Sequence, residues 1–232
     1  MTRPLAVILV ALVVLTTGCA LGEDDEMAPA PRRTVTASPS PQQVVPGSVP
    51  IGEGEVTQAD VVWAQGTVLH IGKQTVDLAP VTIDAFVVVP GGVYVLNSGE
   101  LWFTDLSRLR GTGITDVTGL GVTDDGSRIL VSVTKAGVES DHAYDTGTGK
   151  AASSDGVTPV TAEQRLEGPD RSDVVVPEGF ELAGWAGAAR FYGTVRKEGR
   201  LTAVLSCGLA SKTCTRQGAI EGQVPVVFGT GQ

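Results

Sequence analysis

Acid–base chemistry near neutral pH most often uses histidine, and the sequence contains only His70 and His142. His70 lies between Leu69 and Ile71, which is typical of a residue inside a strand. His142 follows Asp141, whose carboxylate is close enough in sequence to orient an imidazole ring. Neither histidine belongs to a recognised catalytic motif such as G-x-S-x-G or H-E-x-x-H. For both residues we therefore prefer a hydrogen-bonded position in a strand over catalysis.

The adjacent carboxylates of Asp124 and Asp125 point to opposite sides of an extended chain, which favours turn residues over a catalytic pair. Together with Asp116 they offer the oxygen ligands that calcium prefers, but the spacing of a calcium loop is missing. The sequence therefore predicts no metal and no cofactor. A hydrolase whose carboxylates are brought together only by folding stays open, because such a pair leaves no sequence motif.

Cys207 and Cys214 are separated by six residues. Two thiols are too few for a structural zinc site, and the spacing differs from that of a redox motif. We expect a disulfide that closes a hairpin, which would persist outside the cytoplasm. A ring of this size stabilises the folded chain by roughly 2.5 kcal/mol in the chain-entropy model.

Cys19 follows Arg3 and an apolar run from Leu5 to Leu15, which is too short to span a bilayer because a span needs about 20 residues. Residues 1–18 therefore predict a cleaved export signal. The motif Leu15-Thr16-Thr17-Gly18-Cys19 resembles the lipobox of bacterial lipoproteins. That resemblance implies a diacylglycerol on the Cys19 thiol and cleavage just before this residue. An ordinary secretory signal is the alternative.

Residues 19–50 are rich in proline, serine and acidic residues, which predicts a disordered tether after the lipidated cysteine. The rest, residues 51–232, is predicted to form one domain. A formal net charge of −9 argues against nucleic acid as a partner, because phosphate binding needs clustered cations. We therefore expect a protein held on the extracytoplasmic face of a cell membrane by its lipid.

The domain is predicted to be all-β, because short valine-rich and threonine-rich runs alternate with glycine turns. Three-stranded to four-stranded antiparallel meanders are expected over residues 61–78, 85–105, 124–150 and 182–215. The residues that could pack between such sheets, or stack on a sugar or peptide, are Trp63, Trp102 and Trp185.

The third meander carries the most specific pattern. Its segments 125–131 and 144–150, DGSRILV and YDTGTGK, resemble a blade of the bacterial propellers related to the Trp-Asp-repeat family. The resemblance implies that the first turn leads into the inner strands and the second turn links the outer strands. About four blade-like units fit the domain, so we expect a β-propeller-like array, with an incomplete ring or a β-sandwich as alternatives.

No assembled catalytic motif is present, so a binding or scaffold role without catalysis is the leading hypothesis. An envelope hydrolase and an accessory subunit of a membrane complex are the alternatives. The expected partner is a protein or another envelope component. Candidate binding loops are residues 106–114 and 135–142, which interrupt β units with charged side chains: Arg108, Arg110, Lys135, Glu139, Asp141 and His142.

Overall fold

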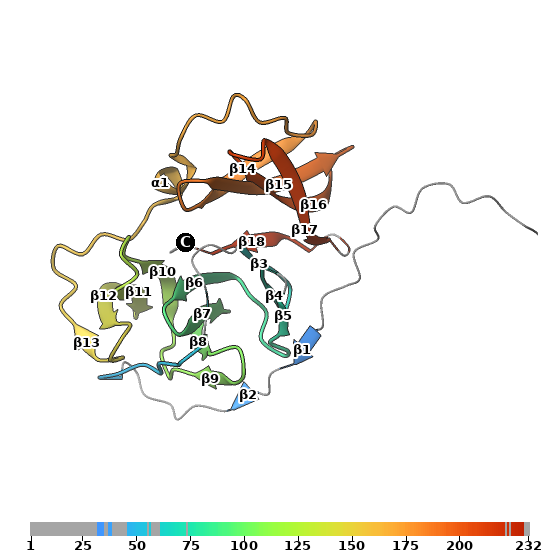
Figure 1. Ribbon diagram of the computed structural model, residues 1–232. Helices are drawn as coiled ribbons and strands as arrows, with labels where there is room; N and C mark the ends of the chain where they lie inside the picture. The colour runs from blue at the N-terminus through green and yellow to red at the C-terminus, as the bar shows by residue number, and fades with distance from the viewer. Residues whose placement is uncertain are drawn as a thin grey trace, which may run out of the picture.

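The computed structural model describes residues 32–34, 37–38, 46–54, 56, 61–72, 74–220, 222 and 224–229. Within them, regular structure is almost entirely β, arranged as four sheets with one short helix (Figure 1). The prediction of an all-β domain with four repeated antiparallel units is confirmed. The predicted export signal and Cys19 lie outside the described residues.

The first sheet joins the two ends of the domain. Strand β18 (Val226–Phe228) pairs antiparallel with β3 (Val62–Gln65), far earlier in the chain. The other strands of this sheet are β4 (Val68–Ile71), β5 (Gln74–Asp77) and, parallel to β5, the short β1 (Arg32–Thr34). The sequence predicted three strands here, because the partner from the end of the chain leaves no local signal.

The second sheet is a continuous meander. Its strands are β6 (Ala85–Val89), β7 (Gly92–Asn97), β8 (Glu100–Thr104) and β9 (Leu109–Gly111), with β2 (Ala37–Ser38) parallel to β9. The predicted unit ended at residue 105, so β9 is an addition. Part of the segment expected to be a tether thus runs along the outer edges of the first two sheets as β1 and β2.

The third sheet matches the blade-like pattern. It contains β10 (Val117–Val122), β11 (Arg128–Lys135), β12 (Val138–Asp145) and β13 (Ala151–Ala152). In the turn before β11, the Asp125 carboxylate accepts hydrogen bonds from the Thr123 hydroxyl at 2.6 Å and the Ser127 amide at 3.0 Å. In the turn after β12, Asp145 accepts bonds from the amide and hydroxyl of Thr148. The two turns lead into the strands that the resemblance implied.

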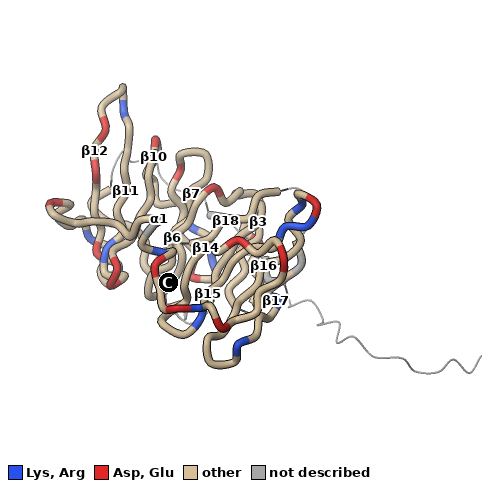
Figure 2. The backbone as a smooth tube through the Cα atoms, turned by 90° about the horizontal axis from the view of Figure 1, so that it is seen from above, with Lys and Arg blue, Asp and Glu red and all other residues tan. Residues whose placement is uncertain are grey.

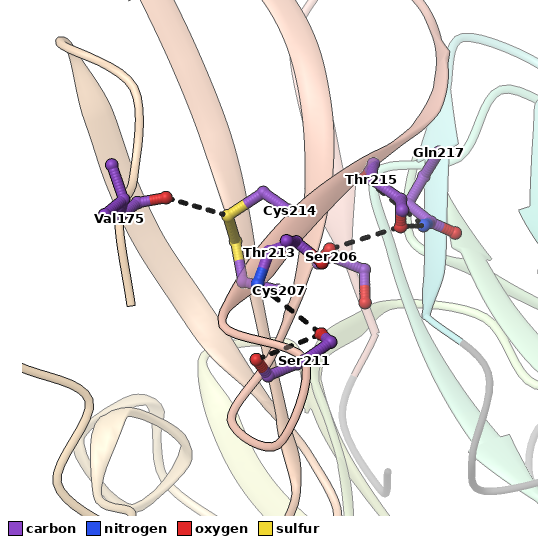
Figure 3. The surroundings of a disulfide bond; sticks show 9 residues. Val175, Ser206, Cys207, Ser211, Thr213, Cys214, Thr215 and Gln217 are labelled. Carbon is purple, nitrogen blue, oxygen red and sulfur yellow. Dashed lines mark hydrogen bonds between the residues drawn. A yellow bond between two sulfur atoms is a disulfide. The ribbon is translucent and has the colours of Figure 1, made fainter. Parts of the chain in front are cut away.

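The fourth sheet follows the helix α1 (Ala162–Leu166) and contains β14 (Phe180–Ala186), β15 (Arg190–Lys197), β16 (Arg200–Gly208) and β17 (Thr213–Ala219). Cys207 and Cys214 are directly opposite each other on β16 and β17 and form the predicted disulfide (Figure 3). The disulfide closes the turn between the two outer strands. In the second and third sheets, aspartates at the same turn bond the backbone instead.

Apolar faces hold neighbouring sheets together. One buried cluster joins the first and second sheets, and another joins the second and third. A third cluster packs Trp63 of the first sheet against Tyr192 and Val204 of the fourth. The inner strand β6 lies against both β10 and β18. The sheets therefore follow one another around an arc in the order third, second, first, fourth (Figure 1).

The arc is open between its two end sheets, and among the described residues no hydrophobic cluster joins the third sheet to the fourth. The outward face of the fourth sheet is covered by its own chain, because Val174 packs on Phe191 and Cys207. The Arg171 guanidinium lies 5.5 Å from the centre of the Phe191 ring. We refer to residues 167–179 as the strap. It covers the face that a neighbouring sheet would cover in a closed ring.

The outward face of the third sheet is polar toward the tip of the hairpin between β11 and β12. Ile129, Val131 and Val133 point into the core shared with the second sheet, so alternate residues of β11 point outward. On that outward face, the Ser132 hydroxyl donates to the Asp141 carboxylate at 2.7 Å. Hydroxyl groups such as those of Ser132 and Thr134 allow this part of the face to contact water without a partner sheet.

The folded part of the chain begins before the predicted boundary at residue 51. Val49 is buried in the core of the second and third sheets. The carbonyls of Pro46 and Pro50 accept hydrogen bonds from Tyr144 at 3.2 Å and Tyr94 at 2.6 Å. The proline-rich composition suggested a tether here, but backbone carbonyls of this segment accept hydrogen bonds from the hydroxyl groups of two buried tyrosines.

No helix among the described residues has the length and hydropathy needed to cross a membrane.

Candidate functional site

Arg108 and Arg110 do not lie in one loop, because β9 runs through the first predicted binding segment. Arg110 donates to the Asp105 carboxylate at 2.7 Å and to the Ile51 carbonyl at 3.2 Å. Its guanidinium also lies 5.4 Å from the Phe103 ring centre. Arg110 therefore contributes to the structure of the second sheet. Arg108 is exposed beside it.

The second predicted binding segment is a hairpin and not a loop, since β11 and β12 continue through it. Polar residues on both faces hid the alternation that predicts a strand. Figure 2 shows this hairpin extending away from the body, with charged residues along its outer part. Lys135, Glu139 and Asp141 are exposed.

The same hairpin places the Ser140 hydroxyl 3.0 Å from Nε2 of His142. Residues two apart on a strand share a face, so this contact follows from local geometry. A nucleophile–base pair also needs a group that orients the base. Among the described residues none hydrogen-bonds the other ring nitrogen of His142, and Ser140 is exposed. The pair is a surface contact.

The two predicted segments lie at opposite ends of the strands. The turn between β7 and β8 is joined to the start of β10 by the bond from the Val117 amide to the Gly99 carbonyl. The Thr134 amide bonds the Asp116 carbonyl at this same end, next to the hairpin tip. Arg108 follows β8 and lies at the other end. The structure therefore does not bring these six candidate residues together into one surface.

Three other residues considered for chemistry are structural. His70 stacks on Trp63 with ring centres 3.7 Å apart, and Trp63 is fully buried between the first and fourth sheets. Trp102 packs against the core of the first two sheets.

A pocket of about 610 Å³ lies where the arc is open, between the third and fourth sheets. It is built from five parts: the turn after β10, the segment before α1, the helix itself, the start of the strap, and the first hairpin of the fourth sheet. Its lining residues are Asp124, Thr158, Pro159, Val160, Gln164, Arg165, Glu167, Gly168, Trp185, Gly187 and Tyr192. We refer to this cavity as the junction pocket.

A reciprocal cap begins α1 and positions its pocket residues. The Thr161 hydroxyl accepts a hydrogen bond from the Gln164 amide at 3.2 Å, and the Gln164 side-chain oxygen accepts one from the Thr161 amide at 2.8 Å. The side-chain oxygen of Gln164 is thus engaged. Its NH₂ group makes no hydrogen bond to a described residue and is available to a ligand.

Arg165, in the last turn of α1, reaches toward the end of the chain. One guanidinium nitrogen donates to the Gly229 carbonyl at 3.3 Å. Its Nε is buried and has no partner within the described part of the chain. Arg165 therefore retains N–H donors that no described residue satisfies.

Tyr192 lines the pocket with a hydroxyl that bonds no other described residue. Burial raises the pKa of Tyr192, and the nearby Arg165 guanidinium opposes that increase. The hydroxyl is therefore a neutral donor and acceptor at physiological pH.

Trp185 is held in place from two sides. Its indole nitrogen donates to the Leu166 carbonyl at 3.3 Å, and its ring lies 5.4 Å from that of Phe191. A β-carbon at Gly168 would overlap the indole ring, so the approach of the strap requires glycine there. The aromatic wall of the junction pocket is thus preorganised.

The junction pocket contains charges of both signs. Asp124 and Glu167 contribute carboxylates, and Arg165 contributes a guanidinium. Neither carboxylate hydrogen-bonds another described residue. Sequence reasoning weighed Asp124 as a turn residue or calcium ligand and Trp185 as a packing or stacking residue. It missed Gln164, Arg165, Glu167 and Tyr192, because the pocket joins segments that lie far apart in the chain. The T-x-x-Q pattern at residues 161–164 was the only local signal, and it indicates a helix start, not a site.

No family model matches the chain, and no curated protein matches it. A solved structure described as TolB of Agrobacterium tumefaciens is 13% identical over 71% of this chain and 55% of its own, with a TM-score of 0.24. A eukaryotic initiation factor is 11% identical over 71% of this chain and 53% of its own, with a TM-score of 0.23. The chain spans about half the length of these structures. Similarities this low support no inference about function, and the propeller-like arrangement rests on the sheet topology itself.

Proposed function

We propose that the protein is an extracytoplasmic lipoprotein, anchored through Cys19, whose β domain binds an envelope ligand at the junction pocket without catalysing a reaction. The lipobox-like motif before Cys19 supports the anchor. The disulfide supports an oxidising compartment, because such bonds rarely persist in the cytoplasm.

The junction pocket is the observation that carries the binding role. Binding sites for small ligands are concave and hold a few converging polar groups on a rigid body. Here the guanidinium of Arg165, the amide of Gln164 and the hydroxyl of Tyr192 meet beside a fixed tryptophan. These groups keep donors and acceptors that no described residue pairs, which makes the pocket a better binding site than the projecting hairpin. In the hairpin, Ser132, Asp141 and His142 hydrogen-bond one another or their neighbours.

A photo-crosslinking pair tests the site in intact cells. We would place a photoreactive residue at Thr158, an exposed residue of the pocket lining, and in a matched variant at Glu139, on the exposed hairpin. Adducts from position 158 alone are expected. Adducts from position 139 alone would transfer the binding role to the hairpin predicted from the sequence. An integral membrane protein attached at either position would favour the accessory-subunit alternative.

The membrane anchor has a separate test. Cys19→Ala should leave unprocessed precursor or release the domain from membranes, and detergent-phase partitioning measures both. An unmodified Cys19 in the membrane-bound form of the wild type would contradict lipidation.

A hydrolase is the second candidate, because folding brings two carboxylates, Asp124 and Glu167, into one cavity. Turnover of an envelope substrate that disappears in both Asp124→Asn and Glu167→Gln, but persists in Asp141→Asn, would establish it over the binding role.

A further inference from the structure

We propose that the junction pocket binds a carbohydrate, through the hydroxyl groups and one C–H face of a short saccharide. This inference rests on the proposed binding function and specifies the ligand class of the same site.

Charge selects against ionic ligands. One guanidinium faces two carboxylates in the junction pocket, from Arg165, Asp124 and Glu167. A phosphate or another multiply charged anion would be repelled by both acids, which have no cation of their own within hydrogen-bond distance in the described structure. A simple cation would meet the Arg165 charge. An uncharged ligand avoids both the repulsion by the carboxylates and the repulsion by the guanidinium.

The unpaired groups have the complementarity that a polyol needs. Gln164 and Arg165 offer N–H donors, Asp124 and Glu167 offer acceptors, and the Tyr192 hydroxyl offers both. Neighbouring sugar hydroxyls each donate and accept, so they can pair with planar amide, carboxylate and guanidinium groups two at a time. An alkyl chain would leave these polar groups unpaired.

The aromatic wall of the junction pocket can bind the apolar C–H face of a sugar. The C–H face of a pyranose ring packs on an aromatic ring, and Trp185 is fixed by its bond to Leu166 and by the close approach of Gly168. A fixed ring loses little conformational entropy when a ligand binds. Pro159 and Val160 add apolar surface to the lining. About 610 Å³ lies within the common range for small-molecule sites, roughly 300–1,000 Å³.

A peptide is the main competitor, and the backbone argues against it. Extended peptides gain affinity by adding a strand to free backbone donors and acceptors. At the wall of the pocket, the Val160 amide is already bonded to the Val122 carbonyl. The backbone at Val160 therefore already pairs with the third sheet, and its amide is not free to bind an extended peptide.

The test is titration of the mature full-length protein with three uncharged probes: the N-acetylglucosamine trimer, maltotriose and mannotriose. Calorimetry gives the affinity, and saturation-transfer NMR shows which sugar protons touch the protein. Asp124→Ala and Glu167→Ala should weaken binding of the recognised sugar at least tenfold. The matched controls Glu139→Ala and Asp141→Ala, which remove exposed carboxylates from the hairpin, should leave binding unchanged.

Each result of the titration bears on the ligand class or on the binding role. A saccharide bound equally by pocket and control variants would overturn the inference. No saccharide binding, with crosslinks from position 158 retained, would overturn the carbohydrate ligand and leave the binding role standing. A trialanine peptide that binds only when Asp124 and Glu167 are intact would replace the sugar by a peptide. Cleavage of a bound saccharide would support the ligand class and refute the non-catalytic role.

Discussion

Replacement of both cysteines by alanine, Cys207→Ala with Cys214→Ala, should destabilise the fourth sheet and release the strap from it. The disulfide closes a ring of eight residues, since the sequence separation is 7. Chain entropy alone then predicts a loss of about 2.5 kcal/mol in the free energy of unfolding. Alanine is preferred to serine because Cys207 is fully buried, and a hydroxyl there would lack a partner.

The loss should reach the strap, because the strap packs on the disulfide. Val174 shares a buried cluster with Cys207, and the Val175 carbonyl oxygen lies 3.8 Å from Sγ of Cys214 (Figure 3). The Lys212–Asp173 ion pair at 3.0 Å is exposed and contributes little. In the double variant, the rate of hydrogen exchange should therefore increase more at residues 173–176 than in the second sheet.

Urea and thermal unfolding measure the effect. For a domain of this size, about 2.5 kcal/mol corresponds to a decrease in Tm of roughly 5–10 °C. Reduced wild type separates the crosslink from the lost sulfur atoms, because reduction keeps both side chains. Ser211→Ala, in the same turn, is the control and should change stability by less than about 0.5 kcal/mol. A double variant and a reduced wild type that both unfold at the wild-type midpoint would refute the reasoning.

Three further predictions concern single side chains. Tyr94→Phe removes the buried donor to the Pro50 carbonyl and should lower the free energy of unfolding by about 1–2 kcal/mol in urea titration; an unchanged midpoint would contradict it. Gly168→Ala should displace Trp185, shift its fluorescence emission and weaken ligand binding at the junction pocket; an unchanged spectrum would show that the strap can move aside. Burial raises the pKa of Asp105, but hydrogen bonds from its own turn and a nearby guanidinium outweigh burial and lower it. Its stabilising contribution is therefore complete above the unfolded pKa near 3.9 and is lost as pH falls through the lower folded pKa, so Asp105→Asn should flatten the acid dependence of the urea midpoint below about pH 4.

Much of the β structure was predictable because its signals are local. Alternation in β11, where Ile129, Val131 and Val133 point to one face, is a property of the strand alone. Asp125 and Asp145 bond amides two or three residues ahead, so their turns form wherever the sequence places them. The disulfide follows the same logic, because a hairpin brings its two cysteines together.

Pairings between distant segments left no such signal. Strand β18 is three residues long, and its partner β3 lies far earlier in the chain. Residues 32–34, 37–38 and 46–50 are proline-rich or polar and were predicted as tether, but sheet edges and two tyrosine hydroxyls offer them hydrogen bonds. At the start of the domain, the structure therefore depends on hydrogen-bond partners in the folded sheets, which the local composition does not reveal.

The sequence by itself determined strand periods, turn chemistry, the cysteine pair and the lipobox-like motif, because each depends on residues a few positions apart. Only the tertiary structure decided that the arc stays open, since that depends on which faces the third and fourth sheets present. Ser132 and Thr134 make one end face polar, and the strap with Val174 covers the other. The junction pocket exists because these two faces do not pack together, so no linear pattern could have revealed it.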